Sequence, residues 1–402
     1  MSWQEDLLRN TLGLSEDLTQ ILLNFGGAII VATIGLLIPI FTIWLERKVS
    51  ARMQDRIGPN RVGPYGLLQS IADVVKLLTK EQITPRNADQ VVFFIAPIIM
   101  VVSVALVFAV MPWNPQEIGT DLSIGILYVI AVTSLGTIAI LMGGWGSNNK
   151  YALLGAFRSI ALLVSYEVPM VMALLVPVLL AGTMRMQGLI EAQGEMWFVF
   201  IAPISMLIFF ISSTAEVGRQ PFDLIEAESE IVAGYNIEYG GMQFAMFYLG
   251  EWLHAVIICV LTAILFFGGW QGPFVHDIPA LGIVYLFGKS FLVYFVHMWA
   301  RFTVPRLRVD HVMSFNWKFL VPLSIFNLLL VAFFWKLMPE PENEGMIAEL
   351  PRTLVLFLVN VGLVAVTLNV MRSYAQRERE KVEALVDEAV YSPTHPTTVA
   401  GH

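Results

Sequence analysis

The sequence predicts an all-α polytopic membrane protein with about nine transmembrane helices and one amphipathic helix on the cytoplasmic surface. The 402 residues are 56% hydrophobic and only 14% charged, and the mean hydropathy of +0.69 excludes a water-soluble protein of this size. Nine spans of about 22 residues would occupy roughly half of the chain, which leaves no room for a large extramembrane domain. The single cysteine, Cys259, excludes a disulfide and a Cys-ligated zinc or iron–sulfur site within the chain.

Nine apolar runs are long enough to cross a bilayer, and each predicts one helix. They cover residues 21–45, 91–112, 123–145, 158–182, 197–215, 242–268, 281–304, 316–338 and 352–372. An acidic start with Glu5 and Asp6 precedes the first run and no small-residue cleavage site follows it, so a cleaved signal peptide is not expected. We expect one transmembrane domain over residues 1–372 and a charged cytoplasmic tail over residues 373–402, with a disordered end after Tyr391.

Basic residues divide unequally between the two sides of these spans. Nineteen of the 24 Lys and Arg residues fall on one side, four fall on the other, and Lys289 lies within a span. The positive-inside rule places the basic side and the C-terminus in the cytoplasm and the N-terminus outside. This arrangement requires an odd number of spans.

Residues 66–81, between the first two spans, predict the surface helix. Six apolar residues follow helical spacing, and Gln69, Asp73, Lys76 and Lys80 form a second, polar stripe. Two Gly-Pro pairs in the preceding RIGPNRVGP indicate a rigid, irregular approach. The pattern indicates a helix lying on the membrane surface, and it is equally typical of such a helix with a merely solvated polar face.

The cytoplasmic segment 216–241 is unusually acidic. Its net charge is −5, because Arg219 alone opposes six carboxylates. Composition alone is typical of a hydrated loop, but interleaved apolar residues favour a buried one. Crowded carboxylates at a membrane boundary disfavour one another's ionisation and can hold protons near neutral pH. The six acidic residues are Glu216, Asp223, Glu226, Glu228, Glu230 and Glu238.

Three ionisable residues lie well inside predicted spans: Glu167, Glu251 and Lys289. A charge at the centre of a membrane helix costs about 3 kcal/mol on insertion scales, so each should face protein or water and is a functional candidate. The alternative for each is a structural hydrogen bond or ion pair between helices. His254 and His297 lie roughly 18 Å and 10 Å from the cytoplasmic ends of their helices, and this difference disfavours a shared haem.

Four motifs, in order along the chain, resemble the H-type membrane subunit of respiratory complex I, the proton-pumping NADH:quinone oxidoreductase. This family includes the first mitochondrially encoded membrane subunit. The resemblance covers about residues 21–338, and the ninth span and the tail lie beyond it. The motifs are ERKVSARMQDRIGPNRVGPYGLLQSIADVVKLLTKE from Glu46, SYEVP after GAFRS, AEVGRQPFDLIEAESEIVAGYNIEYGG from Ala215, and ARFTVPRLRVDHVM from Ala300.

The resemblance implies a subunit of the bacterial inner membrane that holds no redox cofactor and forms most of a quinone tunnel, for either ubiquinone or menaquinone. NADH, FMN and iron–sulfur clusters would belong to partner subunits. Those partners would be the quinone-site and iron–sulfur subunits of the peripheral arm and the small and antiporter-like membrane subunits, with no nucleic acid. The tunnel residues implied are Glu46, Arg47, Arg56, Asp73, Arg219, Asp223, Glu226, Glu228 and Arg301. The implied proton pathway contains Glu167, Glu216, Glu251 and Lys289.

Two alternatives compete with this interpretation. The corresponding subunit of a membrane-bound hydrogenase or formate hydrogenlyase would share the membrane fold without necessarily using quinone. A secondary transporter would have paired interrupted helices and a substrate site at the membrane midplane, and the hydropathy pattern shows no such pair.

Overall fold

The computed structural model describes residues 15–116, 118–224, 233–275, 277–338 and 346–391. These residues are predominantly helical, and the only β-bridge among them joins Pro112 to Ile118. The predicted all-α fold is therefore confirmed. The protein is a multi-pass membrane protein, because its described part contains eight helical segments long and apolar enough to cross a bilayer.

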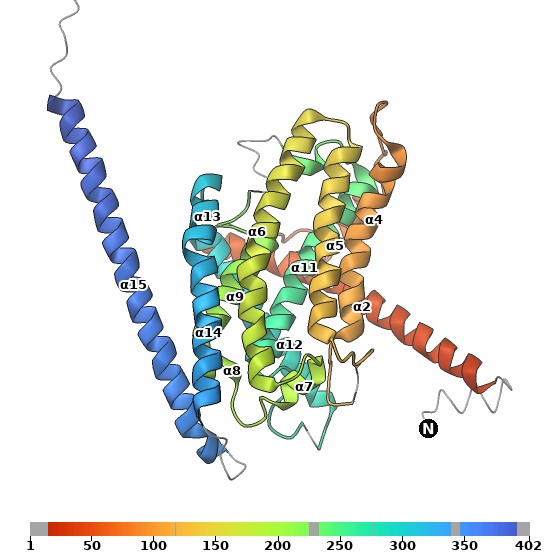
Figure 1. The fold of residues 1–402 in the computed structure, drawn as a ribbon. Helices are drawn as coiled ribbons and strands as arrows, with labels where there is room; N and C mark the ends of the chain where they lie inside the picture. Colours follow the sequence, from red (N-terminus) through yellow and green to blue (C-terminus); the bar gives the residue numbers. More distant parts are fainter. Residues whose placement is uncertain (1–14, 117, 225–232, 276, 339–345, 392–402) are drawn as a thin grey trace, which may run out of the picture.

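The helices run roughly alongside one another, and most of them form a single bundle (Figure 1). Two of the spans contain short segments of other helix types, at η3 (Phe108–Val110) after α4 and at the π-helix η5 (Asn316–Leu320) between α13 and α14. The long helices are α2 (Glu16–Met53), α4 (Gln90–Val107), α5 (Gly125–Gly146), α6 (Lys150–Ala181), α11 (Gly241–Phe266), α12 (Ala280–Thr303), α13 (Val309–Phe315) continuing into α14 (Val321–Leu337), and α15 (Met346–Tyr391).

The predicted span 197–215 is divided into two helices, α8 (Phe198–Ile201) and α9 (Pro203–Glu216). Ala202 between them has non-helical angles, φ −133° and ψ 62°. Pro203 has no N–H and therefore cannot donate an intrahelical bond, although it is well suited to the first turn of α9. The eight long spans together with this divided segment account for the nine predicted apolar runs.

The core centres on α11, which packs against α4 and α12. Every residue from Ala255 to Phe266 is buried. The α5–α6 contact is close because Gly144 has no side chain: an added Cβ would lie 2.4 Å from Ala156 Cβ. Small residues at such crossings are the usual means of bringing membrane helices together.

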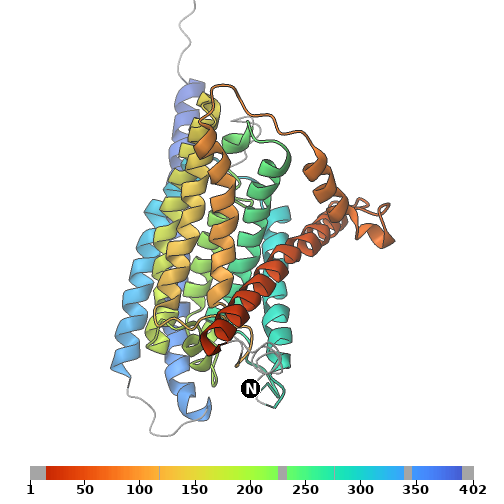
Figure 2. The ribbon, with the colours of Figure 1, turned by 90° about the vertical axis from the view of Figure 1, so that its right-hand side faces the viewer.

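Helix α2 crosses the bundle obliquely, and α3 (Gln69–Thr79) packs beside its C-terminal end (Figure 2). The predicted surface helix is therefore present as α3. Its apolar side chains are exposed, from Val74 at 42% to Leu78 at 58%. Such a face suits contact with lipid or with another protein of the same assembly.

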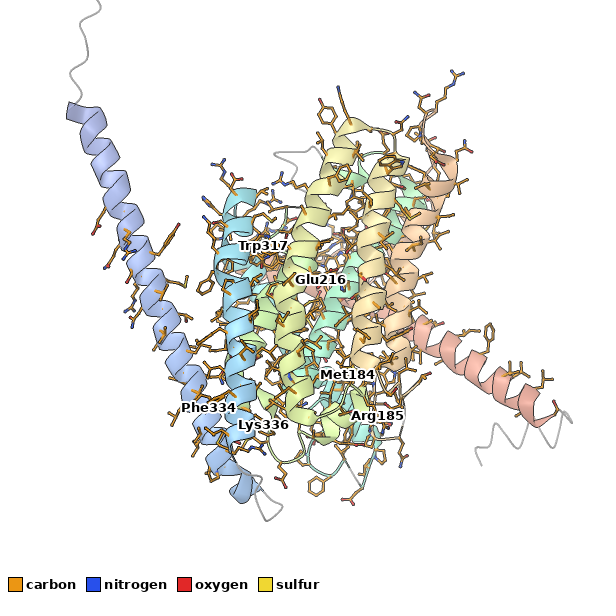
Figure 3. The ribbon with its side chains drawn as sticks, viewed as in Figure 1. Met184, Arg185, Glu216, Trp317, Phe334 and Lys336 are labelled. Atoms are coloured by element: carbon orange, nitrogen blue, oxygen red, sulfur yellow. The ribbon has the colours of Figure 1, made fainter. Side chains whose placement is uncertain are left out.

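The two ends of the bundle differ in the way that the charge pattern predicts. Arg185 and Lys336, two of the four basic residues assigned to the sparse side, lie toward the lower end (Figure 3). The C-terminal end of α15 lies at the upper end, where α6 begins (Figure 1). Helix α15 runs without a break across the predicted domain boundary at residue 372, and its upper part stands away from the bundle.

Candidate functional site

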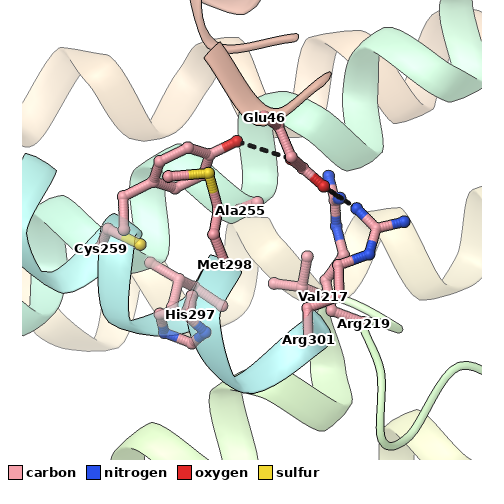
Figure 4. Close-up of a pocket in the computed structure, with 10 residues that line it drawn as sticks. Glu46, Val217, Arg219, Ala255, Cys259, His297, Met298 and Arg301 are labelled. Atoms are coloured by element: carbon pink, nitrogen blue, oxygen red, sulfur yellow. Dashed lines mark hydrogen bonds and ion pairs between the residues drawn. The ribbon is translucent and has the colours of Figure 1, made fainter. Parts of the chain in front are cut away.

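The centre of the candidate site is a buried carboxylate that two arginines share. Arg219 Nη1 donates to Glu46 Oε1 at 2.9 Å, and Arg301 forms a second, shorter ion pair with the same oxygen. The Tyr294 hydroxyl donates to Glu46 Oε2 at 3.0 Å. These residues come from α2, the segment after α9, and α12, so the site exists only when three distant parts of the chain meet (Figure 4).

A cavity lies against this cluster, and we call it the Glu46 cavity. Apolar residues of α11 form one wall of this cavity. Arg219 also stacks over the Trp252 ring, with its Cζ 4.1 Å from the ring centroid. Stacking leaves the guanidinium edge free to donate hydrogen bonds while its face is covered. The cavity is lined by Glu46, Val217, Arg219, Ala255, Ile258, Cys259, Tyr294, His297, Met298 and Arg301.

Tyr294 and His297 line the Glu46 cavity although the sequence did not single them out as tunnel residues. They precede Arg301 on α12 by seven and four positions, spacings that share one helix face. Thr214 Oγ1 donates to the Phe210 carbonyl at 2.6 Å and lies 3.1 Å from His297 Nδ1. Since its proton is already used, the hydroxyl accepts from Nδ1, and the Nε2 of neutral His297 carries the lone pair.

A second ionic group joins α2 to the surface helix α3. Arg47 Nη1 donates to Asp73 Oδ2 at 2.5 Å, and Gln69 and Lys76 also approach this carboxylate. The Arg47 side chain is 41% exposed. Such a pair contributes little to stability by itself, and it joins the C-terminal part of α2 to α3.

Two further predicted tunnel residues, Asp223 and Arg56, do not line the Glu46 cavity. Asp223 accepts from Arg306 Nη2 at 2.7 Å. Arg56 is exposed and donates to Gln54 at 2.8 Å. Glu226 and Glu228 lie outside the described residues, as does Glu230.

The predicted proton-pathway acids meet on the other side of the end of α9. Glu216 and Glu251 line one cavity, which we call the Glu216 cavity, together with His254 and Val217. His254 Nε2 lies 3.9 Å from Glu216 Oε1. Glu216 occupies the interior of the bundle (Figure 3), and its Oε2 is buried with no hydrogen-bond partner among the described residues.

Several further contacts lie around these acids. Tyr235 donates to Glu251 Oε1 at 2.8 Å, and Glu167 on α6 lies close enough to Glu216 to interact with it electrostatically. Tyr239 stacks on Phe93 with ring centroids 4.1 Å apart. Burial raises the pKa of the Tyr239 hydroxyl, which keeps this group neutral as a donor to the Phe93 carbonyl at 3.1 Å.

Lys289 is not close to these acids. Its ammonium donates to the Phe267 and Gln271 carbonyls, each at 2.7 Å, and lies 4.4 Å from the centre of the Trp197 ring. It therefore joins α12 to the loop that follows α11. These contacts are compatible with the structural alternative, and the proton-pathway role of Lys289 stays a prediction.

The two cavities are separated by a single short segment. Val217 lines both cavities, with Glu216 on one side and Arg219 on the other. Gly218 between them has φ +66°, a left-handed conformation that costs other residues roughly 1–2 kcal/mol. This turn directs the neighbouring acidic and basic side chains to different cavities.

Comparison with known proteins tests the family resemblance of the four motifs. The protein-family model described as NADH dehydrogenase matches residues 26–332. The chain belongs to this family. A relative from Dehalococcoides mccartyi strain CBDB1, named as the H-type subunit of NADH-quinone oxidoreductase, is 46% identical over 321 residues, which cover 80% of this chain and 86% of the relative.

Two further relatives carry the same name. The protein from Brevibacillus brevis is 48% identical over 73% of this chain and 87% of its own length. The protein from Geobacillus kaustophilus is 46% identical over 82% of this chain and 97% of its own length. Within the described residues, no three His, Cys, Asp or Glu side chains are grouped as metal ligands. Helix α15 lies beyond the residues that the family model matches.

Proposed function

We propose that this chain is the membrane subunit of a proton-translocating NADH:quinone oxidoreductase, in which it forms the quinone passage and couples quinone reduction to proton transfer. Family membership and the names of the relatives support this assignment. The enzyme's redox centres would belong to partner subunits of the peripheral arm. The basic end of the bundle would face the cytoplasm and that arm, in a bacterial inner membrane.

The charge of the Glu46 cavity is the observation that carries the proposal. Among the residues that line the cavity, Arg219 and Arg301 oppose only the Glu46 carboxylate, so the lining has a net charge of +1. Quinone reduction develops negative charge on the headgroup before protons arrive. An unbalanced guanidinium next to apolar walls would stabilise that charge more strongly than water could.

An apolar approach to this cavity supports the passage of an isoprenoid tail. A neighbouring cavity between α2, α11 and α12 is lined by Ile38, Phe287 and Phe291 among others, and it shares Cys259 and Tyr294 with the Glu46 cavity. On its membrane side, α2 exposes Leu37 and Phe41. A lipid-soluble substrate would therefore reach the Arg-Glu cluster from the bilayer.

Quinone reduction would change the protonation of the acids that line the Glu216 cavity. Glu216, Glu251 and Glu167 form a group of acids inside the bundle, and crowded acids exchange protons readily when a nearby charge changes. The Glu46 cavity is separated from this group by the segment around Val217. A change in the charge or position of Arg219 would thus change the proton affinity of Glu216. This effect would couple quinone reduction to proton transfer.

Exchange of Arg301 for Gln tests the quinone assignment. In membranes with the assembled complex, Arg301→Gln should lower NADH:quinone reductase activity at least tenfold, because one charge-assisted contact contributes about 1.5–3 kcal/mol. NADH oxidation by a hydrophilic artificial acceptor should not change. Arg372→Gln is the matched control, since Arg372 is exposed on α15 and lies beyond the residues that the family model matches. Equal loss of both activities in an assembled Arg301→Gln complex would contradict the proposal.

A further inference from the structure

The break between α8 and α9 interrupts the helical hydrogen-bond ladder within one predicted membrane span, because Ala202 is not helical and Pro203 has no N–H. Helix α8 ends at Ile201, and the Met206 N–H bonds the Ala202 carbonyl at a long 3.3 Å. Backbone groups within a bilayer require partners from the protein, because lipid offers none. The first turn of α9 therefore depends on its neighbours.

Helix α15 supplies such a partner. Asn360 Nδ2 donates to the Ile201 carbonyl at 3.3 Å and to the Leu356 carbonyl of its own helix at 2.9 Å, and the residue is 1% exposed. Leu356 and Leu363, at 0% and 7% exposure, flank it at helical spacing. Elsewhere on the span, Leu358 and Val366 are about 60% exposed. The buried face of α15 is thus centred on one amide that faces the interruption.

The preceding helix makes a parallel contact one turn further along. Asn327 on α14 donates through Nδ2 to Ser205 Oγ at 2.7 Å, and both side chains are buried. Polar contacts between membrane helices contribute about 0.6–2 kcal/mol each. One amide therefore holds the end of α8 and the other holds the first turn of α9. Glu216 ends α9 about 20 Å away at 1.5 Å per residue.

We propose that α15 is a brace for the interrupted span and that Asn360 is a positioning residue, which fixes the start of α9 and thereby the location of Glu216. The family model ends at residue 332, before α15 begins. The brace is therefore a feature of this chain beyond the matched family region. Its effect on α9 is independent of function, whereas its effect on Glu216 rests on the proposed proton-coupling role.

Hydrogen exchange in the purified complex tests the brace. Asn360→Leu keeps similar volume but removes the donor, and it should increase the exchange rate of amides in residues 202–206 about tenfold, the loss expected for one hydrogen bond. Asn360→Gln, which retains an amide on a longer side chain, should exchange at an intermediate rate. Thr367→Val is the matched control, because Thr367 is half-buried on the same helix and its hydroxyl donates to the Val364 carbonyl of that helix, with no other described partner.

Wild-type exchange of residues 202–206 in Asn360→Leu would overturn the brace. If Asn360→Leu fails to assemble, wild-type exchange in Asn360→Gln is the overturning result. The positioning role predicts in addition that the pH profile of quinone-dependent turnover shifts in Asn360→Leu and not in Thr367→Val. Faster exchange with an unchanged pH profile would overturn the positioning of Glu216 while leaving the quinone assignment, tested at Arg301, unaffected.

Discussion

Removal of the Glu46 charge should show how strongly this carboxylate interacts with Arg219 and with Arg301. Glu46→Gln changes the net charge of the Glu46 cavity lining from +1 to +2, because Arg219 and Arg301 both remain. A pair of charges 4 Å apart interacts by about 4 kcal/mol at an effective dielectric constant of 20. Removing one partner of a buried pair typically costs about 3–5 kcal/mol.

Arg219 and Arg301 should not contribute equally to the free energy that is lost when the Glu46 charge is removed. The Arg219 side chain is 14% exposed and the Arg301 side chain is 28% exposed, whereas Glu46 is 5% exposed. Solvent screens the Arg301 pair more strongly. We therefore assign most of the roughly 3–5 kcal/mol to the Glu46–Arg219 pair.

A double-mutant cycle measures this distribution. Glu46→Gln with Arg219→Gln restores a net charge of +1, so the double variant should retain more quinone-dependent kcat/KM than Glu46→Gln alone. We expect a coupling energy of about 1–3 kcal/mol, and a smaller one for Glu46→Gln with Arg301→Gln. The assay is quinone reductase activity of assembled complexes, normalised to NADH oxidation by an artificial acceptor. Strictly additive losses, or a larger coupling with Arg301, would refute the shared-carboxylate reasoning.

Three further outcomes are expected. Glu216→Gln and Glu251→Gln should each lower turnover and the proton-to-electron ratio in reconstituted vesicles, because an amide cannot exchange a proton; wild-type pumping in both would make these acids structural. Lys289→Met should reduce the amount of assembled complex, because the two carbonyl contacts of Lys289 are lost. The proton-to-electron ratio of the complex that does assemble should stay constant. A lowered ratio would instead support the proton-pathway prediction for Lys289. Deletion of residues 376–402 should leave quinone reductase activity within about twofold of the wild-type activity, because the contacts of the brace precede these residues. Deletion of residues 346–402 should increase the hydrogen-exchange rate of backbone amides at the start of α9.

The spans could be predicted because a bilayer demands long apolar runs, and the runs survive in the structure almost unchanged. The interruption at Ala202 could not be predicted from the sequence, because the apolar run continues across it and Pro203 is compatible with an ordinary first helical turn. The helical continuation of the charged tail to Tyr391 was also not predicted. The sequence predicted a charged tail over residues 373–402 with no assigned secondary structure, although Glu, Lys and Arg are good helix formers when they continue an existing helix.

The candidate site was predicted in part. Motif resemblance selected Glu46, Arg219 and Arg301, although no spacing rule could bring together residues 173 and 255 positions apart. Tyr294 could have been found from its seven-residue spacing to Arg301 on one helix. The hydrogen-bond partners of Lys289 could not have been found, because they are backbone carbonyls of a loop whose path depends on the tertiary fold.

The segment between the two cavities also limits how this protein can change over evolutionary time. Only Val217 and Gly218 separate Glu216 from Arg219, and the left-handed turn at Gly218 sets their opposite directions. Inserting or deleting one residue here would redirect the arginine away from Glu46 or the acid out of its cavity. If the two cavities have the proposed roles, substitutions can accumulate on the exposed outer faces of the bundle, while the length of this connection is expected to stay constant.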